Sequence, residues 1–386
     1  MREEFLPFSR PTIGPEETAE VVDCLASGWL TTGPKVQRFE ELLKAETRAA
    51  HAVAMNSGTA ALHVALLALD IGPGDEVITT PMTFAATVNM ILAVGATPVL
   101  VDIDRDSLNI LPELIAAAVT PATRAIMPVH FAGLPCDLDA VHAIAGEHQL
   151  AVIEDAAHAL GSCYHGNPIG ALSAATCFSF HPIKNITTGE GGALCTNDDE
   201  LAEQARVLRF HGISKDAWKR YDARGVPQYD VMALGFKYNM LDLQAAIGIH
   251  QLPKLSQLND RRRRLAAKYR EALADVPGVL VPPEAPAADL HSWHLFVIKM
   301  LPEVLGIGRD DFMARLKERN IGSGLHFRAI HLHPYFAERL QYPVGSLPNA
   351  EWASERIVSL PLFPLMSEGD VDDVVSAICE IGVTRR

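Results

Sequence analysis

Short apolar runs alternate with segments of helical spacing along roughly the first 250 residues of the chain. The runs are rich in β-branched residues and are as short as typical strands. The segments between them, such as 60–69, 84–94 and 112–119, carry apolar residues at helical intervals. This alternation predicts an α/β fold, in which helices cover both faces of a mostly parallel sheet. The predicted strands are 52–56, 76–80, 97–102, 125–129, 151–154, 176–180 and 193–196.

The pattern changes near residue 250, where a long charged helix is predicted over 251–273. Shorter elements follow it, so we expect a large domain of residues 1–250 and a smaller α+β domain of residues 251–386. The polar stretch 216–230 is predicted to be a loop near the substrate or a dimer seam. The elements predicted in the smaller domain are strands 279–281 and 294–299 and helices 309–319 and 371–380.

Lys184 follows an aromatic and β-branched run and precedes the glycine-rich turn 189–192. Apolar flanks of this kind predict a tight, partly dry site. Desolvation lowers the pKa of a lysine, and the neutral amine is a nucleophile. Taken alone, Lys184 is much more typical of a surface loop, so its assignment depends on the residues that accompany it.

Asp155 ends the buried run 151–154 and is the natural companion of Lys184. An amine and a carboxylate at neighbouring strand ends suit an aldehyde cofactor that has a basic ring nitrogen. Pyridoxal 5′-phosphate (PLP) fits this description, with Lys184 as its Schiff-base partner and Asp155 keeping the ring nitrogen protonated. The alternative for Asp155 alone is a capping residue.

The stretch from Ser57 to Thr59 lies between a short apolar strand and an alanine- and leucine-rich helix. Gly58 allows close approach of the backbone, and free N–H groups at a helix start bind anions. Thr59 and Ser179 can add hydroxyls to a phosphate, and Phe84 can stack on a ring. A plain helix cap and a core aromatic are the commoner meanings of such residues.

Together these motifs resemble the StrS/DegT-type sugar aminotransferases, which are PLP enzymes of the aspartate-aminotransferase-like fold (PLP fold type I). The resemblance covers nearly the whole chain and includes 27–35, 58–59, 154–158, the Lys184 segment and 235–240. It implies a homodimer, because Asn239 matches a residue that reaches the phosphate of the neighbouring subunit. It places His158 against the ring or its 3-oxygen. The remaining implied cofactor contacts are Gly58, Thr59, Phe84, Asp155, Ser179 and Lys184.

Segments 324–329, 347–356 and 359–364 resemble the branch of this family that makes UDP-4-amino-4-deoxy-L-arabinose, the sugar that masks lipid A phosphates. That branch implies amination of a UDP-4-keto-pentose with L-glutamate as donor, in lipopolysaccharide biosynthesis. Phe84 and Gly58 depart from it, since the branch has tryptophan and alanine there. Another UDP-, dTDP- or GDP-linked sugar, either a 4-keto-6-deoxyhexose or a 3-keto sugar, therefore stays open as the substrate. Candidate substrate contacts are Thr31, His326, Arg328 and His331.

Composition agrees with an enzyme that acts on small molecules in the cytoplasm. The 386 residues carry a formal net charge of -14, which disfavours binding to nucleic acid or an anionic membrane. The first residues lack the apolar region of a signal peptide, and no apolar stretch has the length of a membrane span. The six cysteines lack CxxC spacing and are predicted to be reduced.

Other eye-catching residues have simpler explanations. The run 261–264 is all arginine, but consecutive helical residues point in different directions, so a solvated helix is expected. The histidine pairs at 291–294 and 331–333 lack further ligands at metal-binding spacing, so we expect no metal. A PLP-binding regulator without turnover would need a basic DNA-binding segment, which this acidic chain does not offer.

Overall fold

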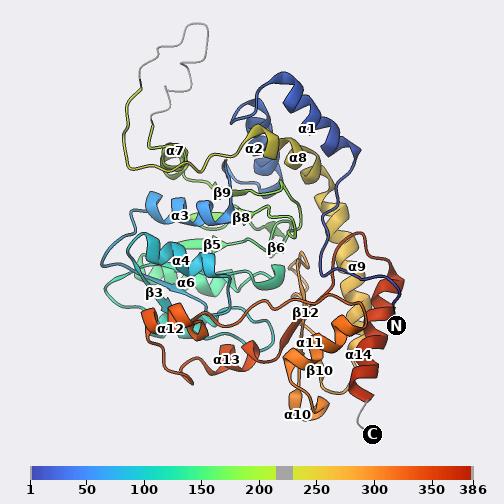
Figure 1. Ribbon diagram of the computed structural model, residues 1–386. Coiled ribbons are helices and arrows are strands. Elements are labelled where there is room, and N and C mark those ends of the chain that lie inside the picture. The colour runs from blue at the N-terminus through green and yellow to red at the C-terminus, as the bar shows by residue number, and fades with distance from the viewer. Residues whose placement is uncertain (1, 214–228, 384–386) are drawn as a thin grey trace.

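The computed structural model describes residues 2–213 and 229–383. Most of the predicted polar loop, 216–228, lies outside the described residues. Seven strands form a large sheet in the order β1-β9-β8-β5-β4-β2-β3 (Figure 1). All neighbours pair in parallel except β9, which runs against β8 and β1. The predicted α/β fold with a mostly parallel sheet is confirmed. The strands are β1 (His51–Met55), β2 (Glu76–Thr79), β3 (Thr97–Leu100), β4 (Thr123–Met127), β5 (Ala151–Asp155), β8 (Ala175–Ser179) and β9 (Gly192–Thr196).

Helices cover both faces of this sheet, because both faces of its strands are apolar. Ile153 packs on one face and Val152 on the other, as alternation along a strand requires. The first face is covered by α3 (Gly58–Ala68), α4 (Ala85–Ala93) and α7 (Asp199–Leu208). The second face is covered by α2 (Pro34–Thr47), α5 (Pro112–Ala118), α6 (Leu138–His148) and α8 (Asp242–Gln251), and α1 (Pro15–Ser27) packs on α8.

A second, smaller sheet lies in the C-terminal part and has the order β10-β11-β12. Its core includes Tyr269, Phe296 and Phe312, all fully buried. Figure 1 shows α9 and α14 side by side along this part, with both termini nearby. The elements are α9 (Leu255–Leu273), β10 (Val279–Leu280), β11 (Phe296–Met300), α10 (Pro302–Leu305), α11 (Arg309–Glu318), β12 (Ile357–Leu360) and α14 (Glu368–Val383).

Two features of the C-terminal part differ from the sequence-based expectation. The long helix begins at Leu255 and not at 251, because α8 ends at Gln251 and Pro253 interrupts the helix in a 3₁₀ turn, Leu252–Lys254. Segments near Ile330 and Phe336 also pack back against Val88 of the large part. The division at residue 250 stays a prediction. The remaining elements are η1 (Phe131–Gly133), β6 (Cys163–Tyr164), β7 (Asn167–Pro168), η4 (Ile330–Leu332), α12 (Pro334–Leu340) and α13 (Pro348–Ser354).

The parallel strands bring their carboxyl ends to one edge of the large sheet. In folds of this kind, ligands bind at that edge. The segments that follow β1, β2, β4, β5 and β8 therefore meet, although they are far apart in the sequence. Within the described ranges, no helix combines the length and apolarity needed to cross a membrane.

Candidate active site

A cavity of about 570 Å³ opens at the carboxyl edge of the large sheet. It is walled by the segments after β1, β2, β5 and β8, and by Leu325 to Phe327 from the C-terminal part. The structure therefore brings together most of the site residues expected from the sequence. Those on the cavity wall are Gly58, Thr59, Phe84, Asp155, His158, Ser179, Lys184 and His326.

Lys184 stands in the turn after β8, where its backbone N–H donates to the carbonyl of His181 at 2.9 Å. Burial of the ammonium lowers the pKa of Lys184 from its ordinary 10.5 to about 8, and the nearby Asp155 carboxylate offsets part of this effect. A pKa near 8 leaves a useful fraction of neutral amine at physiological pH. Lys184 can therefore act both as a nucleophile and as a proton carrier.

Asp155 ends β5 and is almost completely buried, at 5% exposure. Its Oδ2 accepts a hydrogen bond from the Thr87 hydroxyl at 2.7 Å, and its Oδ1 accepts one from the Ala157 amide at 3.1 Å. Burial nevertheless raises the pKa of Asp155 above its ordinary value, and these two donors and Lys184 only oppose that rise. The carboxylate is thus poised to take a proton donor as a partner.

The start of α3 forms a cradle beside Ser179. Ser57 caps the helix by accepting a hydrogen bond from the Ala60 amide at 3.1 Å, which leaves the amides of Gly58 and Thr59 without partners inside the helix. A Cβ on Gly58 would stand 2.9 Å from the Cβ of Ser179, too close for the observed packing. Glycine at 58 thus lets two amides and two hydroxyl side chains converge on one spot that suits an anion.

His158 and Phe327 form an aromatic wall next to Lys184. Their rings stack with centroids 5.8 Å apart at 16°. The Ala132 amide donates to Nδ1 of His158 at 3.3 Å, so the proton of the neutral ring is on Nε2. Burial, together with the charge of Lys184, holds the pKa of His158 well below 6.5. His158 is therefore a neutral ring with one N–H to donate.

Phe84 and His326 stand nearer the outside of the cavity. Phe84 is 62% exposed and its ring lies 6.1 Å from that of Phe327. His326 bonds Ser359 Oγ through Nδ1 at 2.9 Å and stacks on Phe8. Burial, with a smaller contribution from Lys184, lowers the pKa of His326 to about 4. His326 is consequently an uncharged group at neutral pH.

Four expected residues are not on the cavity wall. Asn239 is buried, donates to Thr32 Oγ1 at 2.6 Å, and has an Oδ1 with no hydrogen-bond partner within the described part of the chain. Thr31 and Arg328 are exposed. His331 is buried, with Nε2 3.2 Å from Glu351 Oε1. Within one subunit, none of the four reaches the cavity, so their functional roles stay predictions.

The structure adds cavity residues that the sequence analysis did not single out. Thr83 lies on the wall, and its hydroxyl is 2.7 Å from that of Thr87, the donor to Asp155. Phe327 supplies the ring against His158. Thr83 and Thr87 are four residues apart in the sequence, which is a spacing that can bring two side chains together. Nothing in the sequence indicated that this pair lies next to Asp155.

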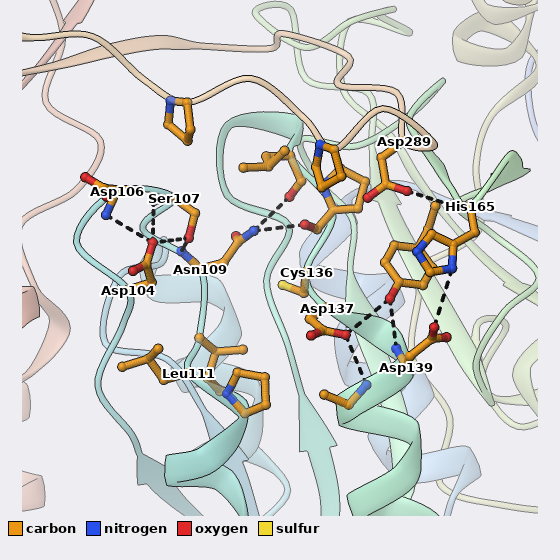
Figure 2. Close-up of a pocket in the computed structure, with 18 of the residues that line it drawn as sticks. Asp104, Asp106, Ser107, Asn109, Leu111, Cys136, Asp137, Asp139, His165 and Asp289 are labelled. Atoms are coloured by element: carbon orange, nitrogen blue, oxygen red, sulfur yellow. Dashed lines mark hydrogen bonds and ion pairs between the residues drawn. The ribbon is translucent and has the colours of Figure 1, made fainter.

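A second hollow, of about 700 Å³, lies between the segment after β3, the start of α6 and the linker 283–289 (Figure 2). Its carboxylates are already paired. Figure 2 shows Asp104 accepting from the Asp106 and Ser107 amides, and Asp289 accepting from the His165 amide. Among the described residues on its wall there is no lysine. Among the described residues, the wall of this acidic hollow therefore offers no amine that could bond an aldehyde.

The Lys184 cavity fits PLP by the chemistry of its groups. A lysine with a lowered pKa suits the aldehyde, and a buried carboxylate suits the ring nitrogen. The amides and hydroxyls around Gly58 suit the phosphate. Groups of all three kinds therefore line one cavity.

Comparisons with known proteins agree with this chemistry. A family model described as the DegT/DnrJ/EryC1/StrS aminotransferase family matches residues 11–379. Spr1654 of Streptococcus pneumoniae, assigned as a sugar aminotransferase, is similar in its PMP form, with 33% identity, a TM-score of 0.92, and coverage of 98% of this chain and 99% of that chain. The same protein was also solved in a PLP form.

Two further solved structures have the same fold along their length. PseC of Helicobacter pylori, an aminotransferase involved in the biosynthesis of pseudoaminic acid, is 30% identical with a TM-score of 0.90, covering 98% of this chain and 99% of that one. DesI, solved in the presence of its TDP-sugar product, is 35% identical with a TM-score of 0.87, covering 100% of this chain and 94% of that one.

Proposed function

This chain belongs to the DegT/DnrJ/EryC1/StrS aminotransferase family, and from that premise we propose that it transfers the amino group of L-glutamate to a 4-keto nucleotide sugar. It is a PLP-dependent sugar aminotransferase, a family activity directed at nucleotide sugars. The best candidate reaction converts UDP-4-keto-pentose into UDP-4-amino-4-deoxy-L-arabinose. The observation that carries the proposal is the desolvated Lys184 beside the buried Asp155 in one cavity.

When bound, PLP supplies an aldehyde that holds the amino group between two substrates and a ring that accepts electrons. Lys184 supplies the amine that bonds this aldehyde. When an amino substrate is bound in its place, Nζ of Lys184 would be a free base inside the cavity. Because its pKa is about 8, Nζ can take up a proton and return it in each half-reaction.

The other cavity residues hold and orient the cofactor in this proposal. Asp155 partners the ring nitrogen, and His158 donates its Nε2 proton toward the ring's 3-oxygen. Gly58, Thr59 and Ser179 bind the phosphate, whose charge suits the start of α3. Phe84 covers one face of the ring from the cavity mouth.

We extend the proposal to a homodimer that shares its active sites. Asn239 matches the family position that reaches the phosphate of the neighbouring subunit, and its buried Oδ1 has no hydrogen-bond partner among the residues described. Large apolar side chains are also exposed nearby in sequence, with Leu234 at 84% and Met232 at 69%. Burial against a second copy removes this apolar surface from water. Thr31, His326, Arg328 and His331 stay candidates for contacts with substrate in that assembly.

The identity of the sugar is the finest part of the proposal. DesI was solved in the presence of its TDP-sugar product, and PseC is involved in the biosynthesis of pseudoaminic acid, so relatives of this fold serve different biosynthetic products. The segments 324–329 and 347–356 resemble the arabinose branch and support that reaction. The reaction of that branch serves lipid A modification, and we place it in the cytoplasm. Gly58 and Phe84 support the alternative, another UDP-, dTDP- or GDP-linked keto-6-deoxyhexose.

The visible absorbance of the PLP-loaded protein tests this proposal in two additions. L-Glutamate should remove the visible band of the resting enzyme, and UDP-4-keto-pentose should then restore it. Loss without recovery would keep the aminotransferase and reject the pentose in favour of another keto sugar. No response to any amino donor would contradict the enzyme and leave a PLP-binding regulator. The Lys184→Ala protein is the matched control and should complete neither half.

A further inference from the structure

Two threonine hydroxyls form a chain that ends on Asp155. Oγ1 of Thr87 donates to Oδ2 of Asp155 at 2.7 Å, and the hydroxyl of Thr83 is 2.7 Å from that of Thr87. A hydroxyl has a single proton, and an ionised carboxylate only accepts. The Thr87 proton therefore goes to Asp155, and the Thr83 proton goes to Thr87. The direction of the chain is fixed by the carboxylate at its end.

This chain is built into a dry part of the protein. Thr83 and Thr87 are 1% and 0% exposed, and Asp155 is 5% exposed. Hydrogen bonds between buried groups strengthen one another and are costly to break. Thr83 also lies on the cavity wall, where a bound cofactor would shield it from water. The Thr87 hydroxyl thus acts on Asp155 from a fully buried position.

The carboxylate of Asp155 is held at both oxygens. Thr87 holds Oδ2 and the Ala157 amide holds Oδ1, while the Asp155 amide donates to the carbonyl of Pro128 at 2.9 Å. Each oxygen keeps one further lone pair for a ligand in the cavity. Without Thr87, the carboxylate could rotate and would lose its strongest neutral donor.

The charged and titratable groups that face Asp155 come from several elements. Lys184 from the turn after β8 and His130 from the segment after β4 favour its charge, and Cys177 of β8 is its buried thiol neighbour. The two threonines do not titrate. Their support of the carboxylate consequently persists at every pH at which the protein is folded.

The turn that carries Thr83 also carries Phe84, the residue proposed to cover the ring. This turn is tied to the C-terminal part, since the Ile330 amide donates to the carbonyl of Pro81 at 2.9 Å. One short segment therefore fixes both the partner of the ring nitrogen and the cover of the ring face. The threonine pair is therefore placed to affect the cofactor, in addition to packing in the core.

We propose that Thr83 and Thr87 are positioning residues that keep Asp155 charged and aligned, and that through Asp155 they hold the proton on the ring nitrogen of bound PLP. This inference rests on the proposed function, because it needs Asp155 to partner that nitrogen. It assigns to the threonine pair an effect on the cofactor that can be measured without turnover.

Glu154, the residue before Asp155, provides a matched control for the loss of a threonine hydroxyl. Thr176 also donates its hydroxyl to a buried carboxylate, Oε1 of Glu154, at 3.0 Å. Glu154 and Asp155 are neighbours on β5 and point to opposite faces of the sheet. Thr176→Val therefore removes the same kind of bond from a carboxylate that does not face the cavity.

The test uses full-length protein loaded with PLP that is ¹⁵N-labelled at the ring nitrogen. The ¹⁵N chemical shift reports the protonation of that nitrogen, and equilibrium dialysis gives the cofactor dissociation constant. We expect the wild-type nitrogen to be protonated across neutral pH. Thr87→Val should move the shift toward the unprotonated position and weaken cofactor binding about tenfold, the scale of one lost hydrogen bond to a charged group.

Three further variants complete the design. Thr87→Ser keeps the hydroxyl and should retain the wild-type shift, whereas Thr83→Val should change it in the same direction as Thr87→Val but less. Thr176→Val should lower the melting temperature and leave the ¹⁵N shift unchanged. If Thr87→Val does not fold, the ¹⁵N shift of Thr83→Val alone tests the inference. The Thr83 hydroxyl does not contact the carboxylate, so we expect its removal to disturb the fold less.

A wild-type ¹⁵N shift in both valine variants would overturn the inference. Failure of the proposed function gives a different result. In that case the wild-type nitrogen is unprotonated, or Asp155→Asn leaves it as protonated as before, and Asp155 is not its partner. A shift that moves equally in Thr176→Val would show a general loosening of β5 and would also overturn the role of the threonine pair.

Discussion

Two large hollows lie within the part of the chain that the structure describes, and the larger of this pair is not the one that suits catalysis. The acidic hollow of Figure 2 measures about 700 Å³ and the Lys184 cavity about 570 Å³. Both contain buried ionisable groups. The difference lies in which protonation state the surroundings favour.

In the acidic hollow, hydrogen bonds favour the charged form. Burial alone would raise the pKa of Asp104, but bonds from the Ser107 and Asp106 amides and the Ser107 hydroxyl lower it overall. In the Lys184 cavity, burial prevails and disfavours the charges of both Lys184 and Asp155. A carboxylate that is held in its charged form stabilises the fold, whereas groups whose charge is disfavoured by burial gain from a partner that a ligand supplies.

The largest expected effect is the loss of turnover in Lys184→Ala. Without Nζ, no amine bonds the aldehyde and no base of suitable pKa stands at the reacting carbon. We expect the rate to fall by roughly 10³-fold or more. Steady-state kinetics with L-glutamate measures this loss. Turnover close to that of the wild type would contradict the assignment of the Lys184 cavity, and not the acidic hollow, as the active site.

Asp155→Asn should have the next largest effect. The amide keeps the shape of the side chain but cannot carry the negative charge that keeps the ring nitrogen protonated. We expect the rate to fall about 100-fold, the scale of losing one well-placed electrostatic group. Single-turnover kinetics with L-glutamate measures this step, and an unchanged rate constant would contradict the role of Asp155.

The third prediction concerns the pH at which apoprotein bonds PLP covalently. Only the neutral amine of Lys184 reacts, so the rate of covalent bonding should rise with pH. It should reach half of its maximum near the pKa of about 8 and level off above that pH. In Asp155→Asn the midpoint should fall, because the carboxylate that favours the ammonium is lost. Stopped-flow absorbance measures both proteins. A midpoint near the ordinary 10.5 would mean that Lys184 is not desolvated.

Asp104→Ala should affect stability and leave catalysis alone. It removes an acceptor of two amides and one hydroxyl, at a cost of about 1–2 kcal/mol in the free energy of unfolding. Because the pKa of Asp104 is lowered in the folded state, its contribution is present at neutral pH and is lost as the pH falls through that value. Urea unfolding at two pH values measures this. A large drop in turnover would show that the acidic hollow matters for the reaction.

Asp139→Asn should have the smallest effect of all. The side chain of Asp139 is 72% exposed and pairs with His165 at 3.4 Å, an arrangement that solvent screens. We expect a change within about 0.5 kcal/mol in stability and no change in rate. The same urea and rate measurements apply, and a loss of substrate binding would assign a ligand to this hollow.

The sequence predicted those site residues that can be identified from their neighbours in the sequence alone. Lys184, Asp155 and Gly58 each stand where a buried strand gives way to a loop, and parallel strands bring such positions together. The strand pattern was equally local, since each run is apolar on both faces. These parts of the fold and site follow from short-range patterns.

Other features depend on partners far away in the sequence and were missed for that reason. Thr87 meets Asp155 across 68 positions, so its role could not be read from either segment. β12 pairs with β11 and is bridged at Ser359 by Gly324, partners that its own four residues do not reveal, and it is too short to identify alone. The start of α9 was placed too early, because the charged pattern continued through the turn at Pro253.

The most direct test of the account is to find where PLP becomes attached. The protein is loaded with PLP, reduced with borohydride to make the link permanent, digested and mapped by mass spectrometry. The account predicts a single modified peptide with the cofactor on Lys184, and none from the acidic hollow. Attachment to any other lysine, or no attachment after loading, would contradict the central claim that the Lys184 cavity is the active site.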